Sequence, residues 1–235
     1  MMSPAIVLAG GLGTRLRSVV ADRPKVLAPV AGEPFLVHLL RQLERSGVRE
    51  IMLATGHGGD QVEAFLASST QGDMVVRCVR EEEPLGTGGA LAFAMREAGI
   101  DRPFFALNGD TFFSGDLRQL EASMAPVTLA LSRVPDAQRF GRVTLATGDD
   151  PVRITGFEEK GAATGPAWIN AGVYRIDPGA LADIEPDTFV SLERDVMPQL
   201  VARGELAGVR FPEASFLDIG TPEAYDRAAD VLATL

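Results

Sequence analysis

The chain has 235 residues, 46 % of them hydrophobic and 23 % charged, which allows a large buried core and excludes a mostly disordered protein. Its formal net charge of −10 argues against a nucleic-acid-binding protein, which typically has a basic face. No apolar run approaches the roughly 20 residues of a membrane span. The first residues lack the basic start of a signal peptide, and a single cysteine cannot form an intrachain disulfide. We therefore expect a cytoplasmic protein that binds neither nucleic acid nor a membrane.

The first half of the chain alternates short apolar runs with helical patterns. Strands are expected at residues 5–9, 51–54, 74–79 and 104–107, and helices at residues 35–45, 61–67 and 88–98. Alternation at this spacing predicts βαβ units around a parallel sheet.

The second half is expected to be richer in strands. We expect strands at residues 127–132, 142–145, 152–157 and 168–175, and helices at residues 192–202 and 222–232. Thr221, Pro222 and Glu223 together form a typical helix start. The prediction is one α/β domain over residues 1–235, with three layers around a mixed, mainly parallel sheet.

A glycine-rich loop, Gly10-Gly11-Leu12-Gly13, directly follows the first expected strand. Backbone N–H groups in such a loop can approach a phosphate closely, and three arginines and Lys25 follow between positions 15 and 25. The loop lacks the Gly-Lys-Ser/Thr of a Walker motif, and Leu16 replaces the third glycine of a dinucleotide fingerprint. Clustered cations beside a glycine turn favour an anion-binding site over a turn without a ligand.

Lysine is scarce, since only Lys25 and Lys160 among the 22 basic residues are lysines. A bias towards arginine codons explains the composition but not the two exceptions. A compact ammonium can approach a single oxygen where a planar guanidinium does not fit. Both lysines are therefore candidate functional residues.

A second glycine loop, at residues 83–90, opens a helix and is a plausible floor for a planar base. Asp110 and Asp218 each follow an apolar strand, and open α/β sheets place ligands at such strand ends. Two carboxylates there suit Mg²⁺, although either aspartate alone could equally be a cap. A hairpin at Asn108-Gly109 is disfavoured because a helical pattern, not a strand, is expected next, from Asp116. His38, His57 and Cys78 are expected to be structural or exposed residues.

Taken together, these motifs resemble the sugar-1-phosphate nucleotidylyltransferase family. The matching blocks span nearly the whole chain: the loop at residues 10–16, Pro24-Lys25, residues 84–89, Asn108-Gly109-Asp110, Glu159-Lys160, Asn170-Ala171-Gly172 and Asp218-Ile219-Gly220. The resemblance implies a Rossmann-like, GT-A-like fold whose residues from about 1 to 125 bind the nucleotide and whose residues from about 126 to 235 bind the sugar phosphate. It also implies Mg²⁺ as cofactor and an NTP and a sugar 1-phosphate as substrates, and it allows a homo-oligomer.

The resemblance further implies roles for single residues. Arg15, Lys25 and Asp110 would be catalytic, with Arg15 on the leaving β- and γ-phosphates and Lys25 on the α-phosphate, and Asp110 and Asp218 would hold Mg²⁺. The nucleotide would contact Leu8, Ala9, Gly10, Gly11, Gly13, Thr14, Thr87 and Gly88. The sugar phosphate would contact Gly109, Gly141, Glu159, Lys160 and Asn170, with Glu159 and Asn170 on hydroxyls and Lys160 on the phosphate.

Within the family, residues 16–20, Asn-Gly-Asp-Thr-Phe-Phe and Ser191-Leu192-Glu193 are most similar to the D-glycero-α-D-manno-heptose 1-phosphate guanylyltransferases. GTP and that heptose 1-phosphate are therefore the expected substrates. Mannose-1-phosphate guanylyltransferases and uridylyl- or thymidylyl-transferring relatives share most of these blocks and stay open. An NAD-dependent oxidoreductase is disfavoured by the missing third glycine and missing ribose acid. A non-catalytic nucleotide-sugar sensor is disfavoured by the intact lysine and aspartate set.

Overall fold

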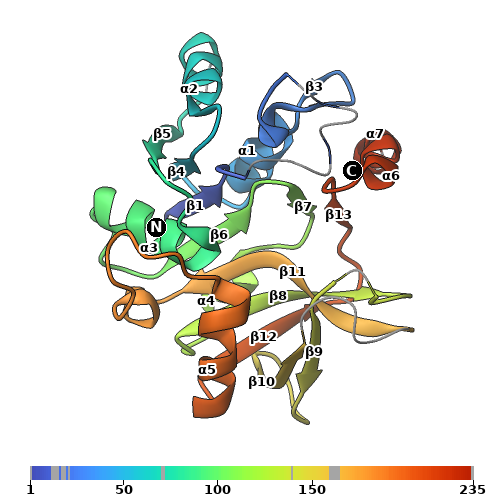
Figure 1. The fold of residues 1–235 in the computed structure, drawn as a ribbon. Helices are drawn as coiled ribbons and strands as arrows, with labels where there is room; N and C mark the ends of the chain where they lie inside the picture. The colour runs from blue at the N-terminus through green and yellow to red at the C-terminus, as the bar shows by residue number, and fades with distance from the viewer. Residues whose placement is uncertain are drawn as a thin grey trace.

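The computed structural model describes residues 2–11, 16, 20, 22–69, 72–138, 140–158 and 165–233. Its centre is a nine-stranded sheet (Figure 1). From one edge to the other the strands are β5 (Val75–Arg80), β4 (Glu50–Thr55), β1 (Ala5–Leu8), β6 (Phe104–Asn108), β11 (Ala167–Ile176), β8 (Val127–Val134), β12 (Leu206–Phe211), β10 (Val152–Glu158) and β9 (Arg142–Leu145).

Strand direction changes where the second half of the chain joins the sheet. The first four strands of this order pair in parallel, as βαβ units require. β11 lies antiparallel to both β6 and β8, β12 is parallel to β8, and β10 is antiparallel to β12 and β9. All strands except β11 and β10 therefore share one direction, which confirms the mixed, mainly parallel sheet.

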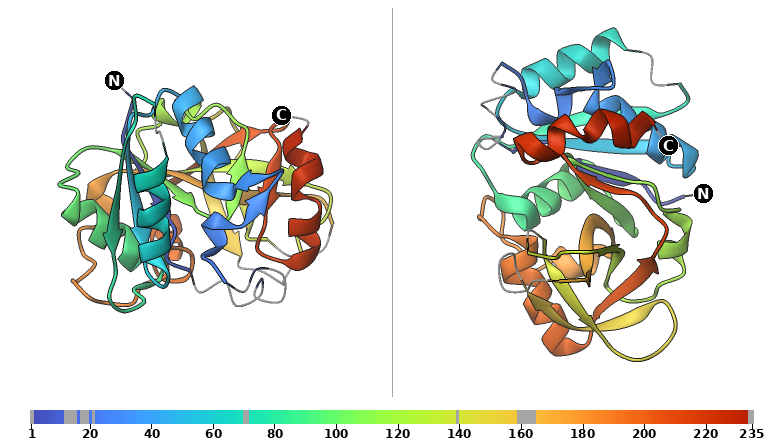
Figure 2. Two further views of the ribbon diagram at one scale, coloured as in Figure 1. Left: turned by 90° about the horizontal axis from the view of Figure 1, so that it is seen from above. Right: turned by 90° about the vertical axis from the view of Figure 1, so that its right-hand side faces the viewer.

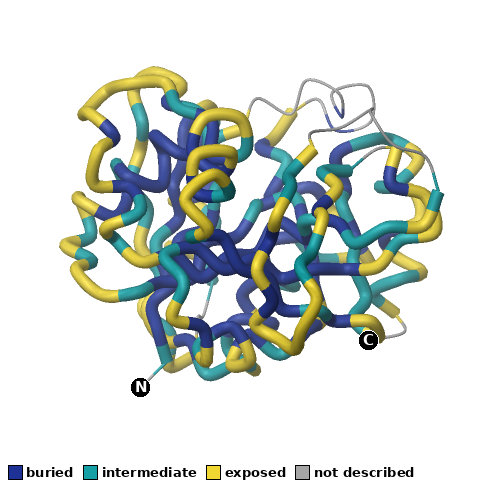
Figure 3. Tube along the Cα trace, turned by 90° about the horizontal axis from the view of Figure 1, so that it is seen from below, coloured by how far each residue is buried: buried dark blue, intermediate teal, exposed yellow. Residues whose placement is uncertain are grey.

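Helices cover both faces of the sheet, as expected for three layers. Ala5 and Val7 of β1 belong to one core cluster together with residues of α1 (Phe35–Arg45) and α2 (Gly59–Ser68). Ile6 belongs to the other cluster, with residues of α3 (Gly86–Glu97) and α5 (Met197–Arg203). Successive strand side chains point to opposite faces, so one short apolar strand supports both layers. Buried residues accordingly run through the middle of the molecule (Figure 3).

The C-terminal helices return to the first half of the chain. Figure 2 shows α6 (Pro222–Asp226) and α7 (Ala228–Ala233) beside the hairpin of β2 (Pro29–Val30) and β3 (Glu33–Pro34). The Tyr225 hydroxyl donates a hydrogen bond to the Pro29 carbonyl at 2.5 Å. Among the described residues, no helix combines the length and the apolar character that crossing a membrane would require.

Besides the short strands β2 and β3, two strands lie where the sequence patterns indicate none. β12 contains Gly208, where an added Cβ would lie 2.5 Å from Leu131 Cδ1, so glycine allows close packing but weakens the strand signal. β7 (Thr111–Phe113) directly follows Asn108-Gly109-Asp110, yet it pairs with β13 (Phe216–Asp218) and not with β6. The described residues therefore contain no hairpin at Asn108-Gly109, although a strand does follow these residues.

Two expected helices are interrupted. The helix expected at residues 192–202 begins as a π-helical turn, η3 (Leu192–Val196), and continues as α5. Pro198 has no backbone N–H to donate to a preceding carbonyl, which disrupts regular α-helical bonding at this junction. The helix expected at residues 222–232 is divided into α6 and α7 at Arg227. Its predicted cap is present, because Thr221 Oγ1 accepts from the Ala224 amide at 3.4 Å.

Candidate active site

The carboxyl ends of β1, β4 and β6 meet at one edge of the sheet. The Ala9 amide donates to the Ala54 carbonyl at 2.7 Å, and the Gly109 amide donates to the Leu8 carbonyl at 2.9 Å. A Cβ at position 109 would collide with that Leu8 carbonyl, so only glycine permits this approach. The predicted loops at residues 9–11 and 108–110 are thereby held side by side, at the edge where parallel sheets bind ligands.

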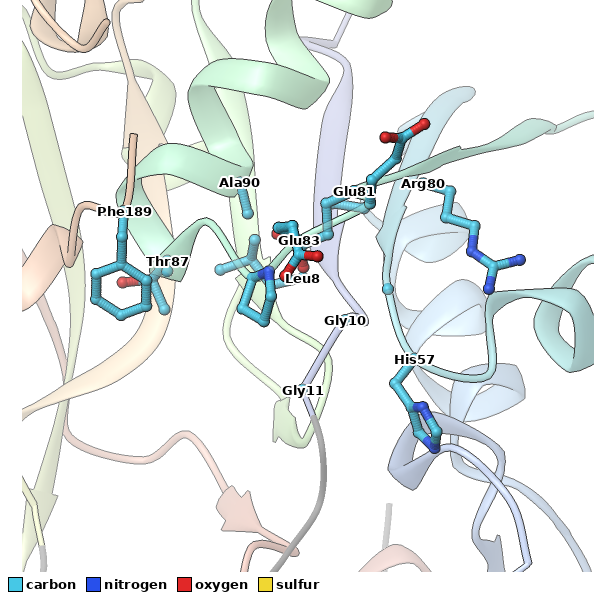
Figure 4. A pocket seen from close by; sticks show the side chains of 15 residues that line it. Leu8, Gly10, Gly11, His57, Arg80, Glu81, Glu83, Thr87, Ala90 and Phe189 are labelled. Atoms are coloured by element: carbon cyan, nitrogen blue, oxygen red, sulfur yellow. The ribbon is translucent and has the colours of Figure 1, made fainter. Parts of the chain in front are cut away.

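A cavity of about 590 Å³ opens beside the first glycine loop (Figure 4). Its lining comes from the ends of β1 and β4, the segment after β5 and the start of α3: Leu8, Gly10, Gly11, Ala54, Gly56, His57, Arg80, Glu81, Glu82, Glu83, Pro84, Gly86, Thr87, Ala90 and Phe189. In Figure 4, Phe189 and His57 lie on opposite sides of Gly10 and Gly11. The predicted residues Leu8, Gly10, Gly11 and Thr87 therefore share one cavity, large enough for a nucleoside.

Glu81 contributes a half-buried carboxylate to this cavity. Its Oε2 accepts a hydrogen bond from the Leu85 amide at 3.0 Å. A Cβ at Gly10 would collide with Glu81 Oε1, and a Cβ at Gly56 would lie 3.2 Å from it, so both glycines make room for the carboxylate. Burial raises the pKa of the Glu81 carboxyl, and the Leu85 hydrogen bond opposes that shift. The cavity thus holds a hydrogen-bond acceptor beside its glycine wall.

The second glycine loop is fixed by a segment of the second half. The amides of Gly88 and Gly89 donate to the Val190 carbonyl at 2.8 and 3.1 Å, and the Val190 amide donates to the Leu85 carbonyl at 2.9 Å. Gly86 has a φ of +70°, and a Cβ there would lie 2.6 Å from the Val190 carbonyl oxygen. This clamp brings Phe189, which is 58 % exposed, to the rim of the cavity.

A second cavity, of about 230 Å³, lies around Lys25 and Asp110. Lys25 begins the short helix η1 (Lys25–Leu27) directly after Pro24, and its Nζ lies 2.6 Å from Asp110 Oδ2. Only 18 % of the Lys25 side chain and 32 % of the Asp110 side chain are exposed, so this ion pair is partly shielded from water. A positive and a negative group thus lie together at the carboxyl ends of β1 and β6.

The pairing of β7 with β13 brings the two predicted aspartates together. Asp218 lies opposite Thr111 in the register, and the Ile219 amide donates to the Asp110 carbonyl at 2.9 Å. Asp218 Oδ1 accepts from the Gly220 amide at 2.6 Å, and a Cβ at Gly220 would lie 3.3 Å from Lys25 Nζ. Among the described residues no group of three or more His, Cys, Asp or Glu forms a metal site, so a cation here would rely on these two carboxylates.

A third cavity, of about 260 Å³, contains the predicted residues Gly141 and Asn170. The Asn170 amide is already engaged, because Nδ2 donates to the Tyr174 hydroxyl at 2.8 Å and Oδ1 accepts from the Gly172 amide at 3.0 Å. Burial raises the pKa of the Tyr174 phenol well above its usual value, with the Glu193 charge as the next cause. Glu193 and Asn108 also line this cavity. Asn108 stands in a block that carries the family resemblance and Glu193 in one that carries the similarity to the heptose 1-phosphate enzymes, although neither was predicted as a site residue.

The three cavities are neighbours that share lining residues. Leu8, Gly11 and Thr87 line both the first and the second, and Thr87 and Asn108 line both the second and the third. Ala9 and Gly109 line the second, while Gly88 is buried near the first in α3. The remaining predicted site residues lie outside the described residues: Gly13, Thr14, Arg15, Glu159 and Lys160.

Three further sequence predictions concern single residues. His57 is exposed, as expected, but it lines the first cavity. His38 is structural, since its Nε2 lies 3.0 Å from the Val30 carbonyl. Cys78 packs partly buried against the core, where burial and then the Glu63 charge raise the pKa of its thiol to about 11. The thiol is therefore protonated at neutral pH and is not an activated nucleophile.

Residues 4–234 match the family model described as nucleotidyl transferase. A mannose-1-phosphate guanylyltransferase of Mycobacterium tuberculosis is 36 % identical over 96 % of this chain, which spans only 63 % of that relative. A D-glycero-α-D-manno-heptose 1-phosphate guanylyltransferase of Aneurinibacillus thermoaerophilus is 34 % identical, with 95 % of this chain and 96 % of the relative covered.

Solved structures of similar sequence have the same fold as this chain. HddC from Yersinia pseudotuberculosis superposes with a TM-score of 0.86 at 33 % identity, covering 98 % of this chain and 100 % of HddC. Its complex with GMP-PN superposes with a TM-score of 0.85 at 32 % identity over the same shares. The α/β nucleotidyltransferase fold that the resemblance implies is therefore confirmed.

Proposed function

The chain belongs to the nucleotidyl transferase family, and from this premise we propose that it transfers a guanylyl group from GTP to D-glycero-α-D-manno-heptose 1-phosphate, releasing pyrophosphate. The observation that carries the proposal is the position of Lys25, Asp110 and Asp218. The Lys25–Asp110 pair lies in the second cavity, which shares lining residues with both the large glycine-walled cavity and the third cavity, and Asp218 lines the third. A transfer between two anionic substrates requires charged groups at the place where the two substrates meet.

The proposed reaction is an in-line displacement at the α-phosphorus of GTP. A phosphate oxygen of the sugar 1-phosphate forms the new P–O bond, the bond between the α-phosphorus and the bridging oxygen to the β-phosphate breaks, and pyrophosphate leaves with that electron pair. The nucleophile is already an anion, so no general base is needed. Catalysis therefore consists of positioning two anions and neutralising their charge, which is the proposed role of Lys25 and Arg15.

Asp110 and Asp218 fit a divalent cation such as Mg²⁺. They supply hard carboxylate oxygens from adjacent strand ends, and Mg²⁺ in nucleotide sites commonly uses one or two carboxylates plus phosphate oxygens and water. When bound, the cation supplies charge neutralisation at the phosphates. Lys25 also pairs with Asp110, so the carboxylate holds the ammonium in place before substrate arrives.

Both parts of the chain contribute to each proposed substrate site. We propose that the nucleotide binds mainly to residues 1–125 and the sugar phosphate mainly to residues 126–235. Phe189 nevertheless reaches the proposed nucleotide cavity, and Thr87, Asn108 and Thr111 reach the proposed sugar cavity. Gly141, Asn170, Glu159 and Lys160 remain the proposed sugar-phosphate residues of the second part.

Glu81 supports guanine over uracil or thymine as the base. Guanine presents an N1–H and an N2 amino group as adjacent donors, which a carboxylate can accept together. Uracil and thymine present one N–H flanked by two carbonyl oxygens, which a carboxylate repels. The position of Glu81, half-buried beside Gly10 and Gly56, suits such a contact.

Replacing Glu81 with glutamine should lower kcat/KM for GTP by about 10- to 100-fold, since a hydrogen bond to a charged group contributes roughly 1.5–3 kcal/mol. The loss for UTP should be smaller, because UTP does not use both acceptors. Steady-state kinetics with both nucleotides measure this ratio. Glu97→Gln, an exposed change on α3, is the matched control. An equal loss for GTP and UTP would remove Glu81 as the base-selecting residue.

The mannose-1-phosphate guanylyltransferase relative makes that sugar the second candidate, although this chain spans less than two thirds of its length. Measuring pyrophosphate release with GTP, UTP, dTTP, CTP and ATP against a panel of sugar 1-phosphates tests the proposal. We expect the highest kcat/KM for GTP with the heptose 1-phosphate. A higher value for UTP or dTTP with every sugar would overturn the guanylyl assignment, and no release with any pair would favour a non-catalytic sensor.

A further inference from the structure

Glu193 lies in the π-helical turn η3 and reaches the third cavity, about 260 Å³ in volume. We propose that its carboxylate accepts a hydrogen bond from a hydroxyl of the sugar 1-phosphate and so helps to select the sugar. This inference rests on the proposed function, because it assumes that the third cavity holds the sugar.

The carboxylate is held by hydroxyl groups from three segments. Thr87 Oγ1 donates to Glu193 Oε2 at 2.7 Å, and Ser191 Oγ lies 3.2 Å from the same oxygen. The Tyr174 hydroxyl lies 3.4 Å from Oε1, the longest of these contacts. An ionised carboxylate offers about four acceptor sites. Oε1 therefore keeps capacity for a further donor, on a side chain whose orientation is already set.

The charges in the second and third cavities favour a sugar hydroxyl, and not the phosphate, beside Glu193. Lys25 provides a cation in the second cavity, which shares Thr87 and Asn108 with the third. A negatively charged carboxylate repels the phosphate group but accepts readily from neutral hydroxyls. The substrate is thus oriented with its phosphate towards Lys25 and its ring towards Glu193.

The third cavity contains one other carboxylate, Asp218, which is assigned to the cation in the proposed function. Phe140, Phe157 and Phe216 contribute apolar rings, and the Asn170 oxygen is occupied by the Gly172 amide. The buried Asn108 Oδ1 has no hydrogen-bond partner among the described residues, so it offers a second acceptor near the Lys25 end. An apolar pocket with a few fixed polar groups is typical of a small-molecule site that reads orientation.

A purely structural role for Glu193 is disfavoured by the clamp between residues 85–89 and Val190. Three backbone hydrogen bonds already join these segments, at 2.8, 3.1 and 2.9 Å. Thr87 Oγ1 also accepts from the Leu192 amide at 2.8 Å, independently of the carboxylate. Removing the Glu193 charge should therefore leave the loop in place.

The test combines variants of Glu193 with substrate analogues. Glu193→Ala and Glu193→Gln are assayed with the best sugar 1-phosphate of the wild-type enzyme and with its monodeoxy analogues, with GTP varied separately. We expect Glu193→Ala to raise KM for the sugar 1-phosphate about 10- to 100-fold, since it removes a hydrogen bond to a charged group. KM for GTP and the midpoint of thermal unfolding should change little. Glu193→Gln, which keeps one acceptor oxygen, should lose less.

One of the monodeoxy analogues should identify the hydroxyl that Glu193 binds. The wild type should show a lower kcat/KM with that analogue than with the full sugar 1-phosphate, whereas Glu193→Ala should show little difference between the two. For analogues that lack any other hydroxyl, the losses from the analogue and from the mutation should be additive. The exposed change Glu185→Gln is the control. Additive losses at every hydroxyl, or an equal rise in KM for both substrates, would overturn the inference. Absence of product from the wild type with every sugar 1-phosphate would instead overturn the proposed function.

Discussion

Lys25→Met should lower kcat by roughly 30- to 1,000-fold, because a single preorganised charge at a reacting centre contributes about 2–4 kcal/mol in other enzymes. Negative charge shifts at the α-phosphate during the displacement, so the ammonium should stabilise the transition state more than the ground state. Such a contact acts on kcat and not mainly on KM. Steady-state kinetics with GTP and the sugar 1-phosphate both varied give the two constants.

Lys25→Arg should not restore turnover. The Lys25 ammonium lies 2.6 Å from Asp110 Oδ2 and close to the Gly220 backbone, where even an added Cβ would be only 3.3 Å away. A planar guanidinium is wider than an ammonium and cannot occupy the same confined point near one oxygen. If Lys25→Arg kept nearly wild-type kcat, the special role of the ammonium would be wrong.

Lys160→Met provides the contrasting variant. The charge of the sugar phosphate changes less during the reaction, so loss of Lys160 should mainly raise KM for the sugar 1-phosphate and leave kcat closer to wild type. Lys160 lies outside the described residues, so this prediction comes from the sequence alone. If Lys25→Met mainly raised KM and Lys160→Met mainly lowered kcat, the phosphates assigned to the two lysines would have to be exchanged.

Asp110→Asn and Asp218→Asn should each lower kcat by about 100-fold or more, since loss of one charge-stabilising group in an active site has effects of that order. Asparagine keeps the shape of the side chain and one acceptor oxygen but removes the negative charge that a divalent cation requires. The backbone bonds that join β7 to β13 are unaffected, including the bond from the Ile219 amide to the Asp110 carbonyl. The fold should therefore persist.

Three measurements check the aspartate prediction. Activity is titrated with Mg²⁺, cation binding is measured directly by calorimetry in the presence of a non-hydrolysable GTP analogue, and thermal unfolding controls for folding. Each variant should need more Mg²⁺ for half-maximal activity and show weaker cation binding. The exposed change Asp101→Asn should behave like the wild type. Full activity of Asp110→Asn in saturating EDTA would contradict the metal assignment.

Local sequence patterns determined most of the elements in the first half of the chain. The apolar run of β1 and the glycines after it, and the periodic leucines of α1, act over a few residues, so each can be predicted without knowing the rest of the fold. The Thr221 cap belongs to the same category, since the donor it satisfies is three residues away. The motifs that identify the family are also contiguous stretches of sequence.

Tertiary structure decided which of these stretches meet. Asp218 reaches Asp110 only because β13 pairs with β7, across more than a hundred residues, and β7 itself is too short to give a strand signal. Glu193 reaches Thr87 because segment 188–193 lies against the start of α3, an approach that requires glycine at positions 86 and 89. Such contacts depend on the packing of distant segments and leave no periodic trace in the sequence. The sequence by itself therefore determined the elements and the chemical groups, whereas long-range strand pairing and packing decided which of these groups line neighbouring cavities.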